Sequence, residues 1–252
     1  MLTSTWSETV DPGKFATQEF ITTDESRNRK ITGAVWLPDE PRASNTVVAF
    51  GHGASGNRYQ APIPYIAHRL VKLGVLCVSM DGPVHGLRER NGGGRKALGP
   101  ELKNADIVDQ MNQDWAIAIE LACSQFGYRD ELFGYFGLSM GSIFGIPMLA
   151  DRITKESPVT AATLGLLGTT GAASQFGNKL LTAAGKIDVP ILFLMQLEDE
   201  LFPRSGYLEL FDSFDSSEKS LHANPGLHPE IPGIEVRHTV DFFHNQLQLS
   251  DR

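Results

Sequence analysis

A serine between two glycines is the feature of this sequence with the clearest chemical potential. Ser139 lies in Gly137-Leu138-Ser139-Met140-Gly141, after an apolar segment predicted to be a strand and before a segment predicted to be a helix. On a sharp strand-to-helix turn a serine adopts strained backbone angles, and the flanking glycines leave room for the chain to close. Such a turn projects the hydroxyl away from the sheet, where it can act as a nucleophile. Glycine-rich connections can show the same spacing without any chemistry, so the interpretation depends on partner residues.

The backbone near Ser139 is expected to supply donors for a developing negative charge. The helix that begins after Ser139 directs its first N–H groups toward the site, and Met140 supplies one of them. A second small-residue turn, residues 51–57, follows the first strand of the predicted parallel sheet. Because its residues are small, the amides of this turn can approach a ligand closely.

The turn at residues 51–57 resembles the HGxxG turn of the α/β-hydrolases. In that family the backbone amide after the His-Gly pair is the second donor of the oxyanion hole, so the resemblance implies this role for Ala54, beside Met140. It also implies that His52 holds the turn by hydrogen bonding and is not the catalytic base. The segment Asp81-Gly82-Pro83-Val84-His85-Gly86 is similar to the family's D-x-x-G-H-G turn, which has a structural role, although Val84 occupies the glycine position.

Three consecutive acidic residues compete to be the acid of a triad. The family's chain order is serine, then aspartate or glutamate, then histidine, so the acid should follow the predicted strand at residues 191–195. Glu198, Asp199 and Glu200 lie there. Asp199 is favoured because residues 199–203 resemble the family's D-x-x-[apolar]-P segment, which leads into the next helix; Glu198 is the second candidate. An acid at a strand end can accept the imidazole Nδ1–H and fix its tautomer.

Four histidines are available for the base, which the family places after the last strand. His228 is favoured because it lies in a predicted loop, whereas His222 lies within the predicted strand and His238 and His244 lie on the last predicted helix. The family's Gly-Gly-His-Gly neighbourhood is only half present around His228. Metal ligation by these histidines is a weaker alternative, because no HExxH motif or Cys pair accompanies them. No metal and no cofactor is therefore expected.

The apolar pattern predicts the elements that position these residues. Residues 15–22 and 30–37 alternate around a turn and predict an antiparallel hairpin, whereas from residue 46 short apolar runs alternate with helical stretches. The runs are 47–50, 75–78, 132–136, 162–167 and 191–194, with a weaker strand at 219–223, and the helices are 62–72, 104–126, 140–152, 203–214 and 236–247. This pattern predicts an α/β fold with a mostly parallel central sheet, an N-terminal antiparallel hairpin and helices on both faces.

The chain is interpreted as a single α/β-hydrolase domain over residues 1–252, with the hairpin at 15–37 and the catalytic core at 46–252. Family members with large lids insert them after the strand equivalent to residues 162–167. Here only about twenty residues connect that strand to the next, so no large lid domain is expected.

The resemblance is nearest to dienelactone-hydrolase-like proteins and small carboxylesterases. Dienelactone hydrolases have cysteine at the nucleophile position, and dehalogenases and epoxide hydrolases of this fold have aspartate there. Ser139 therefore favours a carboxylesterase that acts on a small-molecule ester through an acyl-enzyme. An acyltransferase or a peptidase with the same triad remains an alternative, as does a ligand-binding protein without catalysis.

Charge and composition narrow the partners. The formal net charge of −8 gives no reason to expect binding to nucleic acid or to an anionic membrane. The first 20 residues lack the pattern of a secretory signal, and no window approaches the roughly 20 apolar residues of a membrane helix, so a cytoplasmic protein is the simplest expectation. The two cysteines are too few for a disulfide framework. The sequence does not determine the oligomeric state.

The substrate pocket is the part that the sequence describes least. Residues 82–99 hold six glycines, and a solvated loop is favoured there over a binding loop for an acidic substrate. The basic residues of that segment are Arg88, Arg90, Arg95 and Lys96. Candidate pocket walls, each better explained by ordinary packing, are the loop at residues 82–99, Tyr59, Ile143, Leu201, Phe202 and Leu227.

Overall fold

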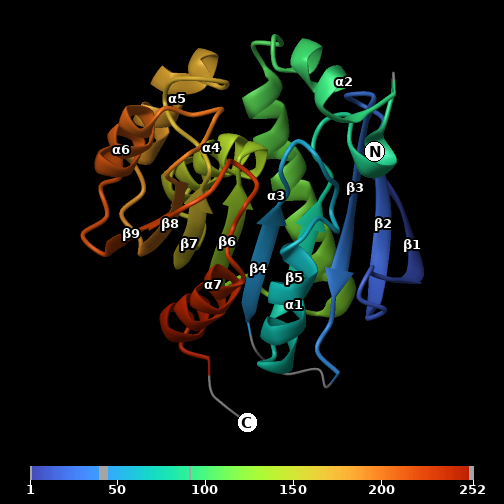
Figure 1. Cartoon of the computed structure of the whole chain (residues 1–252). Coiled ribbons are helices and arrows are strands. Elements are labelled where there is room, and N and C mark those ends of the chain that lie inside the picture. The colour runs from blue at the N-terminus through green and yellow to red at the C-terminus, as the bar shows by residue number, and fades with distance from the viewer. Residues whose placement is uncertain (1, 40–44, 91, 250–252) are drawn as a thin grey trace.

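A nine-stranded sheet forms the centre of the computed structural model, which describes residues 2–39, 45–90 and 92–249 (Figure 1). Its strands are β1 (Leu2–Val10), β2 (Ala16–Asp24), β3 (Arg29–Trp36), β4 (Thr46–Gly51), β5 (Leu76–Met80), β6 (Leu132–Leu138), β7 (Ala161–Gly165), β8 (Ile191–Gln196) and β9 (Lys219–Asn224). The spatial order is β1-β2-β3-β5-β4-β6-β7-β8-β9. The pairs β1–β2, β2–β3 and β3–β5 are antiparallel, whereas β5, β4, β6, β7, β8 and β9 run parallel to one another. The predicted α/β class and mostly parallel sheet are confirmed.

Helices cover both faces of this sheet, as predicted. They are α1 (Ile63–Lys72), α2 (Gly94–Glu101), α3 (Ile107–Phe126), α4 (Met140–Thr154), α5 (Gly177–Ala184), α6 (Arg204–Ser213) and α7 (Gly233–Gln246). α1 and α7 pack side by side on one face, at the front of Figure 1, and α3, α4, α5 and α6 form a layer on the other. Each parallel strand therefore ends near the start of a helix at the upper edge of the sheet.

Strand β4 illustrates why the parallel strands appear as continuous apolar runs in the sequence. Val47 and Ala49 belong to the core beneath α3 and α4, whereas Val48 and Phe50 belong to the core beneath α1 and α7. Side chains alternate between the two faces of a strand, so a sheet buried on both faces needs apolar residues at every position.

The antiparallel part of the sheet is larger than the predicted hairpin. β1 adds a third strand and pairs with β2 along its whole length. Most of its side chains are exposed or half-buried because β1 lies at the edge of the sheet, so it has no strong apolar alternation. Trp6 anchors it against Phe20 and Phe126, with ring centroids 5.4 and 5.1 Å apart.

The glycine-rich segment after β5 is more ordered than a solvated loop. It contains a 3₁₀ turn, Gly86–Arg88, and the helix α2, whose Leu98 is buried in the core. Burial of Leu98 explains a helix that local propensity disfavours, because tertiary packing supplies most helical stability in proteins. The side chain of Arg95 lies outside the described part of the chain.

The connection between β7 and β8 contains only a 3₁₀ turn, Ser174–Phe176, and the eight-residue helix α5. No lid-sized insertion is present in the described residues, in agreement with the prediction. None of the helices in the described ranges combines the length and the apolar character needed to cross a bilayer.

Candidate active site

Ser139 lies on a strained turn between the end of β6 and the start of α4. Its backbone angles are φ 56° and ψ −118°, which only glycine adopts readily. The Ser139 N–H donates to the carbonyl of Gly165 at 2.9 Å. Ser142 braces the same turn, because its hydroxyl lies 2.6 Å from the carbonyl of Gly137 and accepts the Gly165 N–H at 2.9 Å. The turn is thereby fixed to the end of β7.

The glycines on either side of Ser139 are required by close backbone approach. A Cβ at Gly141 would lie 2.3 Å from the carbonyl oxygen of Gly51, and one at Gly137 would lie 2.7 Å from the oxygen of Gly141. Real Cβ atoms do not tolerate such distances, so only glycine lets α4 begin directly against β4. The start of α4 therefore lies beside the turn that follows β4.

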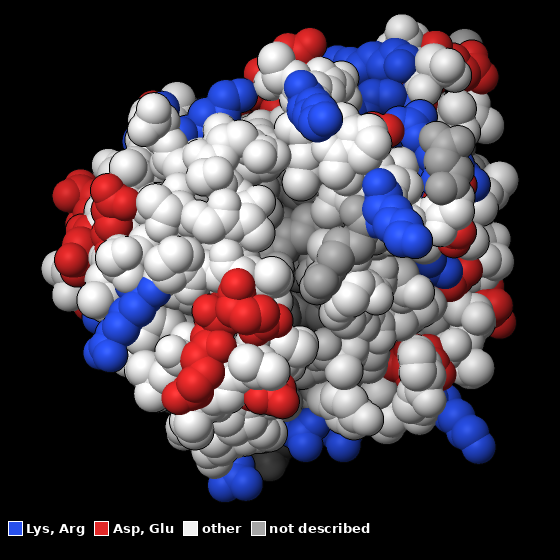
Figure 2. Space-filling model, turned by 45° about the horizontal axis from the view of Figure 1, so that its top comes forward, with Lys and Arg blue, Asp and Glu red and all other residues white. Residues whose placement is uncertain are grey.

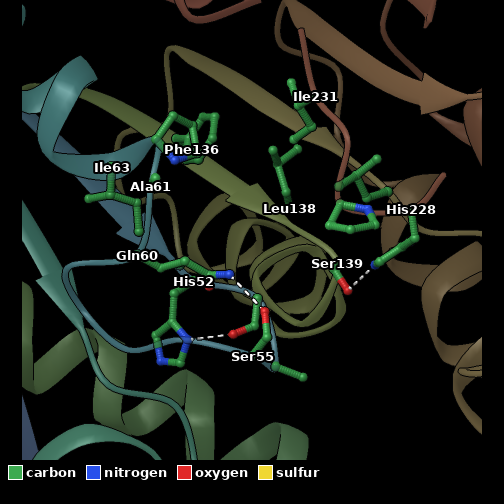
Figure 3. Close-up of a pocket in the computed structure, with 16 residues that line it drawn as sticks. His52, Ser55, Gln60, Ala61, Ile63, Phe136, Leu138, Ser139, His228 and Ile231 are labelled. Atoms are coloured by element: carbon green, nitrogen blue, oxygen red, sulfur yellow. Dashed lines mark hydrogen bonds between the residues drawn. The ribbon is translucent and has the colours of Figure 1, made fainter. Parts of the chain in front are cut away.

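Ser139, His228 and Asp199 form a continuous hydrogen-bonded chain. His228 Nε2 lies 2.9 Å from Ser139 Oγ, and His228 Nδ1 lies 2.7 Å from Asp199 Oδ2 (Figure 3). The His228 and Asp199 side chains are only 6% and 1% exposed, so solvent competes weakly for these bonds. The three residues come from the ends of β6, β8 and β9, which meet because the strands are parallel.

Asp199 accepts more hydrogen bonds than the one that links it to His228. The N–H groups of Leu201 and Phe202 donate to its Oδ1 at 2.7 and 3.0 Å, and the Tyr207 hydroxyl donates to Oδ2. Burial raises the pKa of Asp199, but the hydrogen bonds from His228, Tyr207 and Leu201 outweigh burial and leave this pKa below its ordinary value. Asp199 is thus held ionised and fixed in orientation.

Three carboxylates hold the backbone of the loop that carries His228. Glu200 accepts the N–H of His228 at 2.9 Å, Glu230 accepts the N–H of Leu227 at 2.7 Å, and Glu198 accepts the N–H of Gly226. The bond from the His228 N–H lowers the pKa of Glu200. The two acids that competed with Asp199 in the sequence therefore position the histidine loop and do not contact the His228 ring.

The turn at residues 51–57 is fixed by His52. Its Nε2 accepts the N–H of Gly82 at 2.8 Å, and its Nδ1, which then carries the proton, donates to the carbonyl of Gly53 at 2.7 Å. Burial lowers the pKa of His52 to about 4, so the ring is neutral at pH 7. His52 lies away from Ser139 in Figure 3 and ties two turns together.

The predicted oxyanion donors lie at this junction. Met140 is the first residue of α4, where an N–H has no acceptor within the helix. For the N–H of Ala54, no acceptor is found among the described residues. The carbonyl of Ala54 faces His85 Nε2 at 2.9 Å, and His85 Nδ1 faces the carbonyl of Pro83 at 2.7 Å, so His85 orients the Ala54 peptide.

The turn that contains Asp81 and His85 is structural in this protein. Asp81 accepts hydrogen bonds from Thr32 at 2.7 Å and from the Arg58 side chain at 2.9 Å. Val84, at the position where the family pattern has glycine, has a φ of 58° and is buried. A left-handed backbone accounts for the glycine that the family has at this position. Val84 keeps that backbone conformation although its side chain is β-branched.

A small cavity of about 90 Å³ opens beside Ser139. Its lining includes Ala54, Ser139 and His228, together with Phe136, Leu138 and Ile231 on an apolar side and Gln60 on the other (Figure 3). None of the candidate walls inferred from the sequence lines this cavity, which is lined instead by residues of β6, the 51–63 segment and the histidine loop. The sequence does not distinguish the apolar residues that line this cavity from those that pack elsewhere. Only the three-dimensional path of the chain brings the lining residues beside Ser139.

The charged residues around the site are distributed unevenly. Figure 2 shows acidic side chains gathered beside a central hollow, with Lys and Arg along other edges of the same face. Glu198, Glu200 and Glu230 are exposed near the histidine loop. Arg88 and Arg90 are engaged elsewhere, by Asp114 at 2.9 Å and Glu101 at 2.7 Å. Neither arginine is arranged to receive an acidic substrate.

The sequence does not identify the positioning contacts of Tyr207, Glu200 and His85, although Glu200 is one of the three candidates for the acid. Each acts through another residue, Tyr207 on Asp199, Glu200 on the His228 loop and His85 on Ala54. No short motif marks these contacts, since they depend on where α6, the β8 loop and the 82–86 turn lie in space.

Comparison with known proteins gives a family. No protein-family model matches the sequence, and a search of curated proteins found no match. Among solved structures, a cold-adapted esterase from an Arctic intertidal metagenomic library, bound to polyethylene glycol, is 30% identical with a TM-score of 0.80, and the alignment covers 98% of this chain and 100% of that one. The chain belongs to the α/β-hydrolase superfamily.

Two more distant structures share the fold. Acetyl xylan esterase from Paenibacillus sp. R4 is 16% identical with a TM-score of 0.74, over 98% of this chain and 89% of that chain. Dienelactone hydrolase from Anabaena variabilis is 17% identical with a TM-score of 0.64, over 93% and 99%. These two structures share the fold, and the 30% identical Arctic esterase supports a hydrolase of the esterase type.

Proposed function

We propose that this protein is a serine carboxylesterase that hydrolyses small, uncharged carboxylic esters through an acyl-enzyme on Ser139. The observation that carries the proposal is the hydrogen-bonded chain from Ser139 through His228 to Asp199 at the mouth of a cavity. The Arctic relative is an esterase, which supports the same reaction class for this protein.

In the proposed acylation step, His228 Nε2 takes the proton from Ser139 Oγ while the oxygen attacks the ester carbonyl. The positive charge that develops on the imidazole is stabilised by Asp199, which also fixes the Nδ1–H tautomer. The carbonyl oxygen becomes an oxyanion and is held by the N–H groups of Ala54 and Met140. His228 then gives its proton to the leaving alcohol.

Deacylation reverses these roles. Water replaces the alcohol, His228 takes a proton from it, and the resulting nucleophile attacks the acyl carbonyl on Ser139. Collapse of the second tetrahedral intermediate releases the carboxylic acid and returns the proton to Ser139. None of these steps requires a metal or a cofactor.

The cavity limits the acyl group in this proposal. Its volume of about 90 Å³ leaves room for a small acyl group such as acetyl beside Ser139 and offers little enclosed space to a long chain. The exposed carboxylates beside the histidine loop disfavour a negatively charged ester. A neutral short-chain ester is therefore the favoured substrate class.

Replacing the nucleophile tests the mechanism. We expect Ser139→Ala to lower kcat/KM for p-nitrophenyl acetate by at least about 10³-fold. Ser205→Ala, an exposed serine on α6, is the matched control and should retain activity. A fluorophosphonate probe should label the wild type at Ser139. Substantial hydrolysis by Ser139→Ala, or a label on another residue, would contradict the assignment.

A series of p-nitrophenyl esters tests the acyl limit separately. Forcing extra methylenes into a small cavity costs about 1–3 kcal/mol, so kcat/KM should be about 5- to 150-fold higher for acetate than for octanoate. Higher activity on octanoate would refute the size limit but leave the mechanism intact.

Adding alcohols or amines distinguishes hydrolysis from acyl transfer, because a transferase would form the new ester or amide in place of the acid.

A further inference from the structure

Two histidines and a buried glutamate converge at a place that the proposed reaction does not use. His222 lies on β9, and Glu235 and His238 lie on the first turns of α7. Nδ1 of His222 lies 2.9 Å from Glu235 Oε2, and Nδ1 of His238 lies 3.2 Å from the same oxygen. The three potential ligand atoms all lie within 4.8 Å of one another, and a search of the described residues finds no other such group.

We propose that His222, Glu235 and His238 form a binding site for a divalent transition-metal ion of the zinc type. Two imidazoles and one carboxylate are a three-residue ligand set that zinc accepts, with water in the fourth position. A tetrahedral zinc ion with bonds of about 2.0–2.1 Å separates its ligands by about 3.4 Å. The observed separations from Glu235 need to widen by only a few tenths of an ångström.

The burial of Glu235 explains why a cation is favoured there. Its side chain is 4% exposed, and within the described part of the chain no Lys or Arg forms an ion pair with it. A buried carboxylate without a compensating positive charge is destabilising. The start of α7 supplies a partial positive charge only, whereas a divalent ion compensates the carboxylate fully.

The exposure of the two histidines provides access. Their side chains are 34% and 41% exposed, so an ion can enter from solvent and keep a water ligand. In each imidazole the ligand nitrogen is Nδ1, which now faces Glu235. This nitrogen must lose its hydrogen before it binds a metal. The site therefore combines one buried ligand, Glu235, with two solvent-accessible ligands, His222 and His238.

The location of the site gives the ion a structural role. His222 precedes the loop at residues 225–232, and Glu235 and His238 follow it. This loop carries His228. It begins at the end of β9 and ends at the start of α7, which are the two elements that the ion would join. Metal binding would fasten β9 to α7 and limit the separation of the loop's ends, without contacting Ser139. The inference does not depend on the proposed esterase activity.

Calorimetric titration with zinc chloride tests the site on the full chain after treatment with a chelator. We expect one equivalent to bind, and expect His222→Ala, His238→Ala and Glu235→Gln each to weaken zinc binding at least about 10-fold. His244→Ala removes another histidine of α7 and should bind as the wild type does. Zinc should also raise the Tm of the wild type and of His244→Ala, but not that of the three site variants.

Two controls separate the possible outcomes. Far-UV circular dichroism checks that each variant folds, and Glu235→Gln preserves the size of the one buried side chain. His228→Ala tests whether zinc binds at the Ser139–His228 pair. Zinc binding that is lost in His228→Ala and retained in His222→Ala would overturn the proposal, as would an absence of stoichiometric binding to the wild type.

Discussion

At the scale of single residues, Asp199 is the group on which most contacts of the site converge. Its two oxygens accept hydrogen bonds from His228, from the Tyr207 hydroxyl and from two backbone N–H groups. The carboxylate therefore has little freedom to rotate away from the imidazole. Burial raises the pKa of the Tyr207 hydroxyl, and its bond to Asp199 raises it further, so Tyr207 remains a donor at all ordinary pH values.

Removing the Tyr207 hydroxyl tests its role as a positioning residue. A hydrogen bond to a charged group contributes about 1.5–3 kcal/mol, so Tyr207→Phe should lower kcat for an acetate ester by about 10-fold with little change in KM. Steady-state kinetics on the purified variant measures both constants. Tyr65→Phe, which removes an exposed hydroxyl, is the control. A lower Tm with unchanged kcat would show that Tyr207 contributes to stability alone.

At the scale of elements, the site is built where β4 and β6 end beside the start of α4. The missing side chains of Gly51 and Gly141 allow the helix to approach the strand, and this approach brings the Met140 amide near the 51–57 turn. His52 then ties that turn to the segment after β5. The proposed oxyanion donors, Ala54 and Met140, thus depend on packing between elements that are distant in sequence.

Adding one methyl group at the helix start should disturb this arrangement. In Gly141→Ala the new Cβ would lie 2.3 Å from the Gly51 oxygen, so α4 must shift. We expect a loss of about 1–3 kcal/mol in the free energy of unfolding and a fall in kcat, measured by urea denaturation and ester hydrolysis. At Gly99 an added Cβ meets nothing within 4 Å, so Gly99→Ala should leave kcat unchanged.

The neutral state of His52 makes its contribution dependent on pH. Its pKa is about 4 in the folded protein and 6.5 in a model compound, so the unfolded chain binds the proton more readily. The stabilisation from His52 is therefore fully present above pH 6.5 and decreases as the pH falls toward 4. The stability difference between the wild type and His52→Asn should be larger at pH 7 than at pH 4.5, by urea denaturation. An equal difference at both values would contradict this account.

At the scale of the whole molecule, buried charges join the antiparallel strands to the helical layer. Asp114 on α3 is 2% exposed and lies 2.5 Å from Arg29 of β3 and 2.9 Å from Arg88. Burial raises the pKa of Asp114, and the two arginines oppose that effect. These pairs lie outside the cavity beside Ser139.

Neutralising Asp114 should weaken the fold without altering the chemistry. Asp114→Asn leaves two partly buried guanidinium groups without a counter-charge, and breaking a buried pair in this way costs about 3–5 kcal/mol. We expect a decrease of this order in the free energy of unfolding, with kcat/KM unchanged under conditions where the variant is folded. Asp109→Asn, an exposed change on the same helix, is the control. A large change in kcat/KM with normal stability would be inconsistent with a purely structural role.

The parts of the fold that are buried on both faces could be predicted, because continuous burial leaves a direct apolar pattern in the sequence. β4 and β6 are of this kind. β1 and α2 were not predicted, since β1 is exposed at an edge and α2 is stabilised by burial of Leu98. Their residues carry no local pattern strong enough to indicate those elements.

The sequence by itself determined that Ser139 lies between two glycines at the end of a strand, with acidic residues and histidines in the order that a serine hydrolase needs. Backbone sterics and strand periodicity are sufficient to place Ser139, and the significance of the residue order comes from the resemblance to the α/β-hydrolases. The tertiary structure decided which acid meets His228, which residues line the cavity and that His222 meets Glu235 and His238. These contacts join residues from separate strands and helices, and their distances are set by how the sheet packs.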